Sequence, residues 1–492
     1  MIIPIIIGMM TIPIILISCK KSGNTTDPGG NPQSNATPPA VSGYTVTSIG
    51  TVTATCGGNI TSDGGAPVTD RGVCWSTTQT PLTTDFKTSS GTGTGSFTSG
   101  LTGLFPGTTY TVRAFATNSA GTSYGIPIVF TTNYVPLAAA YFPIAVWDQD
   151  PTKNAIGYTS IGINIFVGLW NALDATLWSA IKGAGLKLIC AQNSYALSLG
   201  ADPSLVGYNM EDEPDNAQAN GSGGYNPCIA PSYIINEYQT LKQNDPSRLV
   251  YLSLGQGVAY NNYIGRGTCR NNLDTYKVST NGYLVGCDMC SFDIYPVNNT
   301  DGITNGKLEY VAMGVQNLIA WSGNKPAWCW IESTRIEDTS PRRPTTSEVK
   351  SEVWMALIHG AKGFGYFCHS FVTGATDEAA MLHDAEMSNA IKAINAQVTY
   401  LAVVLNSATT IGYATVSSDN GSVPVDIMAK NYGGANYIFA IAMSNGQANA
   451  SFTVTSGTSA EVMGEGRAIP ITNGKFSDLF LPYAVHLYKI TN

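Results

Sequence analysis

Charge is scarce in this sequence, and positive charge is the scarcer kind. Only 12% of the 492 residues are charged, with 25 Lys and Arg against 33 Asp and Glu, for a net charge of −8. Proteins that bind nucleic acid gather Lys and Arg to displace counterions from phosphates, so we expect no nucleic-acid partner. Phosphate-binding loops and the Gly-x-Ser-x-Gly elbow of serine hydrolases are also missing. We therefore expect no cofactor.

Apolar residues are plentiful by comparison. The hydrophobic fraction of 43% and the aromatic fraction of 10% are enough to bury a core, which argues against a disordered chain. At about 100–200 residues per domain, the length predicts about three domains.

The N-terminus has the pattern of an export signal. Residues 1–18 form an apolar run, short for a membrane span, that ends in Leu16-Ile17-Ser18-Cys19. This ending resembles the lipobox of bacterial lipoproteins, and the resemblance implies a signal over residues 1–19 with a lipidated Cys19. The expected location is the outer membrane, on a side that the sequence leaves open. An ordinary signal anchor is the alternative, since no Lys or Arg precedes the run.

Residues 20–40 are rich in Gly, Ser, Asn and Pro, and this composition predicts a flexible linker.

Cysteine usage fits an exported protein. Two disulfides are compatible with the sequence, Cys56 with Cys74 and Cys228 with Cys269. Cys287 and Cys290 have a metal-like spacing, but no second Cys or His pair accompanies them, so we expect no metal site.

Residues 41–132 carry short Thr-, Val- and Ser-rich strands separated by turns, which predicts a β-sandwich. Within them, the alternating stretch 109–118 and the preceding Pro106-Gly107 resemble a strand of fibronectin type III-like domains. The resemblance implies a spacer, with carbohydrate binding as the alternative.

The pattern from 141 to 404 changes to short apolar strands that alternate with amphipathic helices. Eight βα units in about 260 residues predict a (β/α)8 TIM barrel. The third helix must be very short or replaced by a loop, because only residues 192–204 separate the strands on either side of it. Residues 405–492 return to alternating strands and predict a small C-terminal β-sandwich. The expected barrel strands are Ile144–Trp147, Ile163–Val167, Leu186–Ala191, Leu205–Asn209, Leu249–Leu254, Met289–Tyr295, Pro326–Glu332 and Gly363–Phe367, and the expected helices are Asp174–Ala184, Tyr233–Gln243, Leu308–Trp321 and Ser347–Gly360.

Two of these strands end on carboxylates. The fourth runs into Glu211-Asp212-Glu213-Pro214-Asp215, and the seventh ends at Glu332. Barrel active sites lie at the C-terminal ends of the strands, and strands four and seven lie across the barrel from each other. Two carboxylates facing across a ligand are what glycoside hydrolysis requires. Repulsion among the acids of 211–215 predicts a raised carboxyl pKa, which suits an acid catalyst.

The Glu-Pro after strand four and the aromatic strand that ends in Glu resemble clan A glycoside hydrolases, which are retaining (β/α)8 enzymes. The segments 162–164, 291–296 and 354–363 share the likeness, and glycoside hydrolase family 158, a β-1,3-glucanase family, is the nearest relative that we would name. The resemblance implies double displacement on a β-linked glucan, with Glu213 as acid/base and Glu332 as nucleophile. The clan usually has Asn before the acid/base, where it hydrogen-bonds the sugar 2-hydroxyl, whereas this chain has Asp212. The resemblance therefore implies that Asp212 binds substrate, with an altered preference for the group at the sugar 2-position because Asp cannot donate as an amide does.

Further residues at the strand ends are candidates for substrate binding. By resemblance, Tyr295 hydrogen-bonds the nucleophile. Each of the others either contacts sugar or packs in the barrel; they are Trp147, Trp170, Trp330, Gln192, Asn193, Gln256 and His369. The overall prediction is a monomeric, membrane-tethered glycosidase that acts on carbohydrate. A surface glycan-binding lipoprotein with a degenerate barrel and a structural adhesin remain the alternatives.

Overall fold

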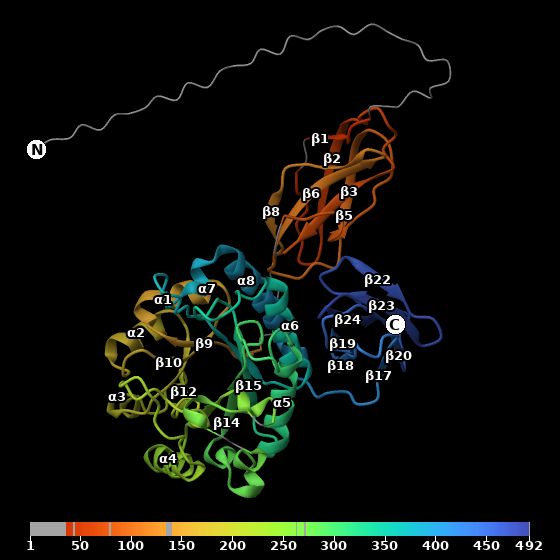
Figure 1. Ribbon diagram of the computed structural model, residues 1–492. Helices are drawn as coiled ribbons and strands as arrows, with labels where there is room; N and C mark the ends of the chain where they lie inside the picture. The colour runs from red at the N-terminus through yellow and green to blue at the C-terminus, as the bar shows by residue number, and fades with distance from the viewer. Residues whose placement is uncertain are drawn as a thin grey trace, which may run out of the picture.

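The computed structural model describes residues 36–42, 45–77, 80–133, 140–261, 263–269 and 272–491. The predicted lipobox with Cys19 and most of the linker therefore lie outside the described residues. Figure 1 shows three folded parts: an N-terminal sandwich in red and orange, a barrel in yellow to cyan, and a C-terminal sandwich in blue. Within the described ranges, no helix combines the length and the apolar character needed to cross a bilayer.

The N-terminal part is a sandwich of two antiparallel sheets. One has the order β1-β2-β5, and the other has the order β4-β3-β6-β7, with β8 paired to β6. Trp75, Tyr110 and Val112 are buried between them. Cys56 and Cys74 are free, buried thiols, so this candidate disulfide is absent. The strands are β1 (Ala40–Ser42), β2 (Ala54–Ser62), β3 (Asp70–Ser76), β4 (Phe86–Lys87), β5 (Gly95–Leu101), β6 (Thr109–Asn118), β7 (Gly121–Tyr124) and β8 (Ile128–Thr131).

The central part is a closed parallel barrel in which strands β9 to β16 follow one another in sequence order. The predicted (β/α)8 architecture is confirmed, because apolar strands of four to six residues can be buried on both faces only when helices cover the outside. Side chains such as Tyr251, Trp328 and Trp330 fill the interior. The strands are β9 (Ile144–Gln149), β10 (Ile165–Leu169), β11 (Lys187–Cys190), β12 (Leu205–Asn209), β13 (Leu249–Leu254), β14 (Met289–Asp293), β15 (Ala327–Glu332) and β16 (Gly363–Phe367).

Helices surround the barrel unevenly. The third helix has five residues, as its short connection predicts. Between β13 and β14, short 3-10 helices take the place of an α-helix among the residues described there: η1 (Gln256–Val258), η2 (Arg266–Thr268), η3 (Leu273–Thr275), η4 (Val278–Thr280) and η5 (Tyr283–Gly286). The α-helices are α1 (Pro151–Ser160), α2 (Ala175–Gly183), α3 (Ser194–Ser198), α4 (Pro231–Asn244), α5 (Glu309–Ser322), α6 (Thr346–Ile358), α7 (Ala380–His383), α8 (Ala385–Tyr400) and α9 (Ala402–Leu405).

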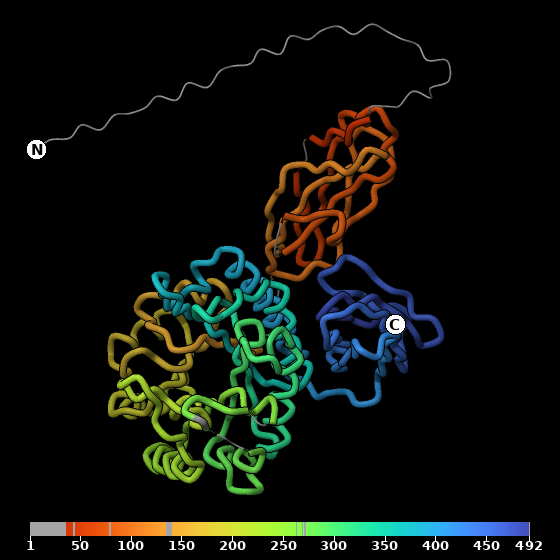
Figure 2. Tube along the Cα trace, viewed as in Figure 1, coloured from red at the N-terminus to blue at the C-terminus, as the bar shows by residue number. Residues whose placement is uncertain are grey.

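The C-terminal part is a second antiparallel sandwich, with sheets β17-β20-β23 and β18-β19-β24-β21-β22. It packs on α6, where the rings of Trp354 and Phe439 lie 5.3 Å apart. The N-terminal sandwich touches both other parts, through Phe105 on Tyr400 and through a backbone hydrogen bond from Gly464 to Gly103 (Figure 2). Its strands are β17 (Ala414–Ser418), β18 (Val425–Tyr432), β19 (Ala435–Ala442), β20 (Ala448–Val454), β21 (Ser459–Val462), β22 (Arg467–Pro470), β23 (Lys475–Phe480) and β24 (Val485–Thr491).

Candidate active site

A cavity of about 460 Å³ opens at the C-terminal ends of the barrel strands. Its wall combines carboxyl groups, amides and aromatic rings, the mixture expected of a site for a polar ligand with apolar faces. Residues of this cavity include Asp212, Glu213, Gln256, Arg266, Asp293, Tyr295, Asn298, Asn299, Phe367 and Phe371.

Glu213 sits on a strained piece of backbone just beyond β12. Its φ of +43° lies in the left-handed region, which L-residues other than Asn and Asp seldom adopt. Asp148 in β9 has the same φ and also faces the barrel mouth. Strain of this kind persists where the surrounding structure enforces it, and it is common at functional sites.

Glu213 is held by groups from the loops after β12 and β13. Arg266 Nη2 lies 2.6 Å from Glu213 Oε2, and Asn216 Nδ2 donates to the same oxygen at 3.1 Å. A side chain at position 255 would place its Cβ 2.9 Å from Glu213 Oε1, so glycine is needed there for this close approach. The Glu213 side chain is 14% exposed, which leaves it accessible from the cavity.

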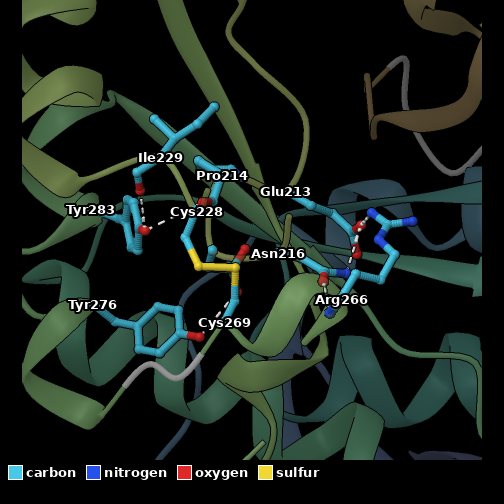
Figure 3. Close-up of a disulfide and its surroundings, with 10 residues drawn as sticks. Glu213, Pro214, Asn216, Cys228, Ile229, Arg266, Cys269, Tyr276 and Tyr283 are labelled. Carbon is cyan, nitrogen blue, oxygen red and sulfur yellow. Dashed lines mark hydrogen bonds and ion pairs between the residues drawn. A yellow bond between two sulfur atoms is a disulfide. The ribbon is translucent and has the colours of Figure 1, made fainter. Parts of the chain in front are cut away.

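The Cys228–Cys269 disulfide braces these two loops against each other. Figure 3 shows the bridge beside the Glu213–Arg266 ion pair, with Asn216 between them. Asn216 Oδ1 accepts the backbone N–H of Arg266 at 2.7 Å, which connects the bridged loops to the ion pair. Of the two disulfides compatible with the sequence, the one that forms is therefore the one at the site.

Other carboxyl groups crowd Glu213. Asp293 ends β14 and lines the same cavity as Glu213, and burial together with the Glu213 charge raises the pKa of Asp293 well above its usual range. Asp212 is exposed to both cavities of the barrel mouth, and desolvation by the surrounding walls together with the Glu213 charge raises the pKa of Asp212 as well. Asp215 is fully buried, accepts from Gly255 N and Tyr276 Oη, and has a pKa raised to about 6 by burial. Burial is the largest cause of each of these shifts, and repulsion, the cause expected from the sequence, adds to it.

Glu332 does not line the cavity. It is 0% exposed, and its carboxylate accepts the backbone N–H groups of Val297 and Asn298 and the Asn298 side-chain amide, at 2.6 to 2.9 Å. Glu352, from α6, is also 0% exposed, and neither of its carboxyl oxygens has a hydrogen-bond partner among the described residues. Burial raises the pKa of both carboxyl groups, and the N–H donors offset part of the rise for Glu332. The open placement of Glu332 opposite Glu213, which the sequence led us to expect, is not found.

A second cavity, of about 500 Å³, shares Asp212 with the first. Trp147, Asp148 and Trp170 line it, and Trp170 is 51% exposed. A row of rings joins the two cavities, with successive centroids 5.2 to 6.0 Å apart, in the order Trp170, His369, Phe367 and Tyr295. The barrel mouth thus offers an aromatic surface on both sides of Asp212.

Some of the remaining candidate residues line a cavity, and the others make structural contacts within the barrel. Gln256 lines the first cavity and accepts from Asn299, and Tyr295 lines it beside Phe367 without a described hydrogen bond to Glu332. Four others have structural partners and lie outside both cavity walls: Gln192 bonds to α4, Asn193 caps α3, Trp330 bonds to Tyr251 in the barrel core, and His369 is 2% exposed.

Neither Asp293 nor Arg266 was predicted from the sequence as a site residue. The sixth strand was predicted to run to Tyr295, whereas it ends at Asp293, so the carboxyl group at the true strand end was not recognised. Arg266 lies in an irregular loop, and no signal in the sequence marks it. In the described part of the chain, no cluster of three or more His, Cys, Asp or Glu side chains is arranged to hold a metal ion, and Cys287 and Cys290 are buried thiols.

No family model matches the sequence, and no curated protein matches it. Several solved structures have a similar fold. One is a GH30 endoxylanase from Clostridium papyrosolvens, which is 14% identical in sequence with a TM-score of 0.38, and the match covers 73% of this chain and 98% of the endoxylanase. An α-amylase from Geobacillus thermoleovorans is 9% identical with a TM-score of 0.45, and the match covers 71% of this chain and 98% of the amylase. A GH2 β-galacturonidase from Eisenbergiella tayi is 10% identical with a TM-score of 0.36, and the match covers 70% of this chain and 69% of the galacturonidase. Similarity this remote does not bear on the substrate of this chain.

Proposed function

We propose that this protein is a glycoside hydrolase whose active site is the cavity around Glu213. The observation that supports this best is a carboxylate on strained backbone, ion-paired to Arg266, that lines an open cavity together with a second carboxyl group. Hydrolysis of a glycosidic bond needs one carboxyl group to donate a proton and another, ionised, to stabilise the anomeric carbon. Neighbouring carboxyl groups in unequal surroundings can divide these tasks.

The surroundings of the carboxyl groups suit a sugar. Aromatic rings stack on the apolar faces of pyranoses, and side-chain amides bind their hydroxyl groups. Phe371 and Trp170, both about half exposed, and the amides of Gln256 and Asn299 are placed for these contacts.

For the finer chemistry, we propose a retaining double displacement on a β-linked glycan, with β-glucan as the first substrate to try. The sequence resemblance supplies this part of the proposal. It also assigns Glu332 as the nucleophile, which requires that carboxylate to give up its N–H donors and reach the cavity.

A glycan-binding protein without catalytic activity is the second candidate, because the buried Glu332 would be a defect in a clan A enzyme. The deciding experiment incubates purified protein with a panel of β-glucans, β-galactans, β-mannans and α-glucans and measures released sugar, with E213Q as the matched control. Release by the wild type and none by E213Q supports the enzyme. Binding of a glycan without any release supports the second candidate.

We also propose a lipid anchor at Cys19 for an exported, outer-membrane protein. The test is metabolic labelling with a radioactive fatty acid, which we expect to mark the wild type and not C19S. Equal labelling of both would refute the anchor.

A further inference from the structure

We propose that Asp293, and not Glu332, is the carboxyl group that works with Glu213, with Asp293 as acid/base and Glu213 as nucleophile. The inference rests on the proposed glycosidase function. It reverses the role that the sequence resemblance implies for Glu213.

The barrel geometry brings these two residues together. Glu213 follows β12 and Asp293 ends β14, and only β13 lies between them. A barrel presents the C-terminal ends of its strands, and the loops that follow them, at one mouth. The strand between them continues into Gly255, where a Cβ would lie 2.9 Å from Glu213 Oε1. Glu213 and Asp293 line the same cavity, so a sugar bound in it can contact both carboxyl groups.

The two carboxyl groups have unlike surroundings. Glu213 accepts hydrogen bonds from Arg266 and Asn216. Oδ1 of Asp293 is buried and has no hydrogen-bond partner among the described residues, a position that is costly for a carboxylate and tolerable for a neutral acid. The titratable groups that face Asp293 are Glu213, Asp212, Asp215, Tyr263 and Tyr295, and the carboxylates among them favour its neutral form.

The reaction then balances over two steps. In the first, a Glu213 oxygen bonds to the anomeric carbon, the bond from that carbon to the leaving oxygen breaks, and the Asp293 proton moves to that oxygen. In the second, Asp293 takes a proton from water, the water oxygen bonds to the anomeric carbon, and the bond to Glu213 breaks. Asp293 is then neutral and Glu213 ionised, as at the start.

Glu332 has a different task in this scheme. Its bonds to Val297 and Asn298 shape the loop that presents Asn298 and Asn299 to the cavity, so it is a positioning residue. A carboxylate with three N–H donors and no exposed surface is a poor nucleophile, because attack would first require breaking these bonds.

The test compares D293A, E213A and E332A on an aryl glycoside of the sugar that the wild type releases, with and without azide. A dinitrophenol leaving group needs no proton, so D293A should form the glycosyl-enzyme and azide should speed its breakdown to a retained glycosyl azide. Azide should replace the missing nucleophile of E213A and give the inverted azide. On a natural glycan, D293N should lose about 100- to 10,000-fold in kcat/KM, the usual contribution of an acid/base group.

If Glu332 only positions the loop, E332A should give no glycosyl azide. E332Q should then lose little kcat and should melt at a lower temperature than the wild type. Inverted azide from E332A, or a fully active D293N, would overturn the inference and leave the glycosidase proposal standing. A wild type without glycosidase activity would overturn both. Melting curves of each variant, with D274N at an exposed site as control, exclude misfolding as the cause of a loss.

Discussion

Arg266 forms an ion pair with Glu213 in which the nitrogen and oxygen lie 2.6 Å apart, although the two residues are 53 positions apart in the chain. The Arg266 side chain is 42% exposed, so solvent weakens the interaction. Its value lies in orienting the carboxylate.

Replacing Arg266 with Met should therefore lower kcat/KM by about tenfold, which corresponds to about 1.4 kcal/mol, while the melting temperature stays nearly constant. Arg266→Lys keeps a charge and should restore part of the loss. Steady-state kinetics on the best glycan from the panel check this. An unchanged rate in Arg266→Met would mean that the ion pair has no part in the reaction.

The disulfide that braces this ion pair should matter for both stability and activity. Cys228 and Cys269 close a loop across 41 positions, and bridges of this span are worth about 2–4 kcal/mol. The Cys228→Ser/Cys269→Ser double variant should unfold at a lower denaturant concentration and lose rate through a misplaced Arg266. Cys56→Ser, a buried thiol far along the chain in the N-terminal sandwich, is the control for lost cysteine. A double variant as active and as stable as the wild type would refute the brace.

The barrel was predictable because its signal is local. Apolar runs such as Leu205–Asn209 and Leu249–Leu254 need no distant partner to identify them, and the structure has both with unchanged bounds. The short helix after β11 followed from counting residues alone. The strand ends also located the carboxyl groups, because a TIM barrel presents its C-terminal ends at one mouth.

The direction of each carboxyl group was not predictable in the same way. The carboxylate of Glu332 is bound by N–H donors of the loop after β14, and no spacing in the sequence indicates this contact. Glu213 Oε1 comes close to residue 255, where a Cβ would lie 2.9 Å from it. Contacts of this kind depend on loop shape and on residues far apart in the chain.

Asp215 should make stability fall with rising pH over a defined window. Its folded pKa of about 6 lies above the value of about 3.9 for an unfolded chain, because burial disfavours the charged form. Between these values the folded state binds more protons than the unfolded state, so the unfolding free energy decreases as pH rises from about 4 to about 6. The full effect is about 3 kcal/mol, since each pKa unit corresponds to about 1.4 kcal/mol.

Asp215→Asn cannot ionise, so its unfolding free energy should change less over this window than that of the wild type. Denaturant titrations at several pH values measure the difference. Asp274→Asn, at a side chain that is 66% exposed, is the matched control and should follow the wild type. Parallel curves for Asp215→Asn and the wild type would show that Asp215 does not ionise within this window.

Trp170 should matter more for long substrates than for short ones. Its exposed ring begins the aromatic row that leads from the second cavity to Tyr295, so a chain bound across Asp212 would reach it only by extending beyond the first cavity. Aromatic contacts are worth about 0.5–1.5 kcal/mol, and Trp170→Ala should therefore raise KM about 2- to 10-fold for long oligosaccharides and leave KM for aryl monosaccharides unchanged. Tyr233→Ala, at an exposed ring on α4 outside both cavities, is the control. If Trp170→Ala changes KM equally for long and short substrates, the binding site lies wholly in the first cavity and Trp170 has only a structural role.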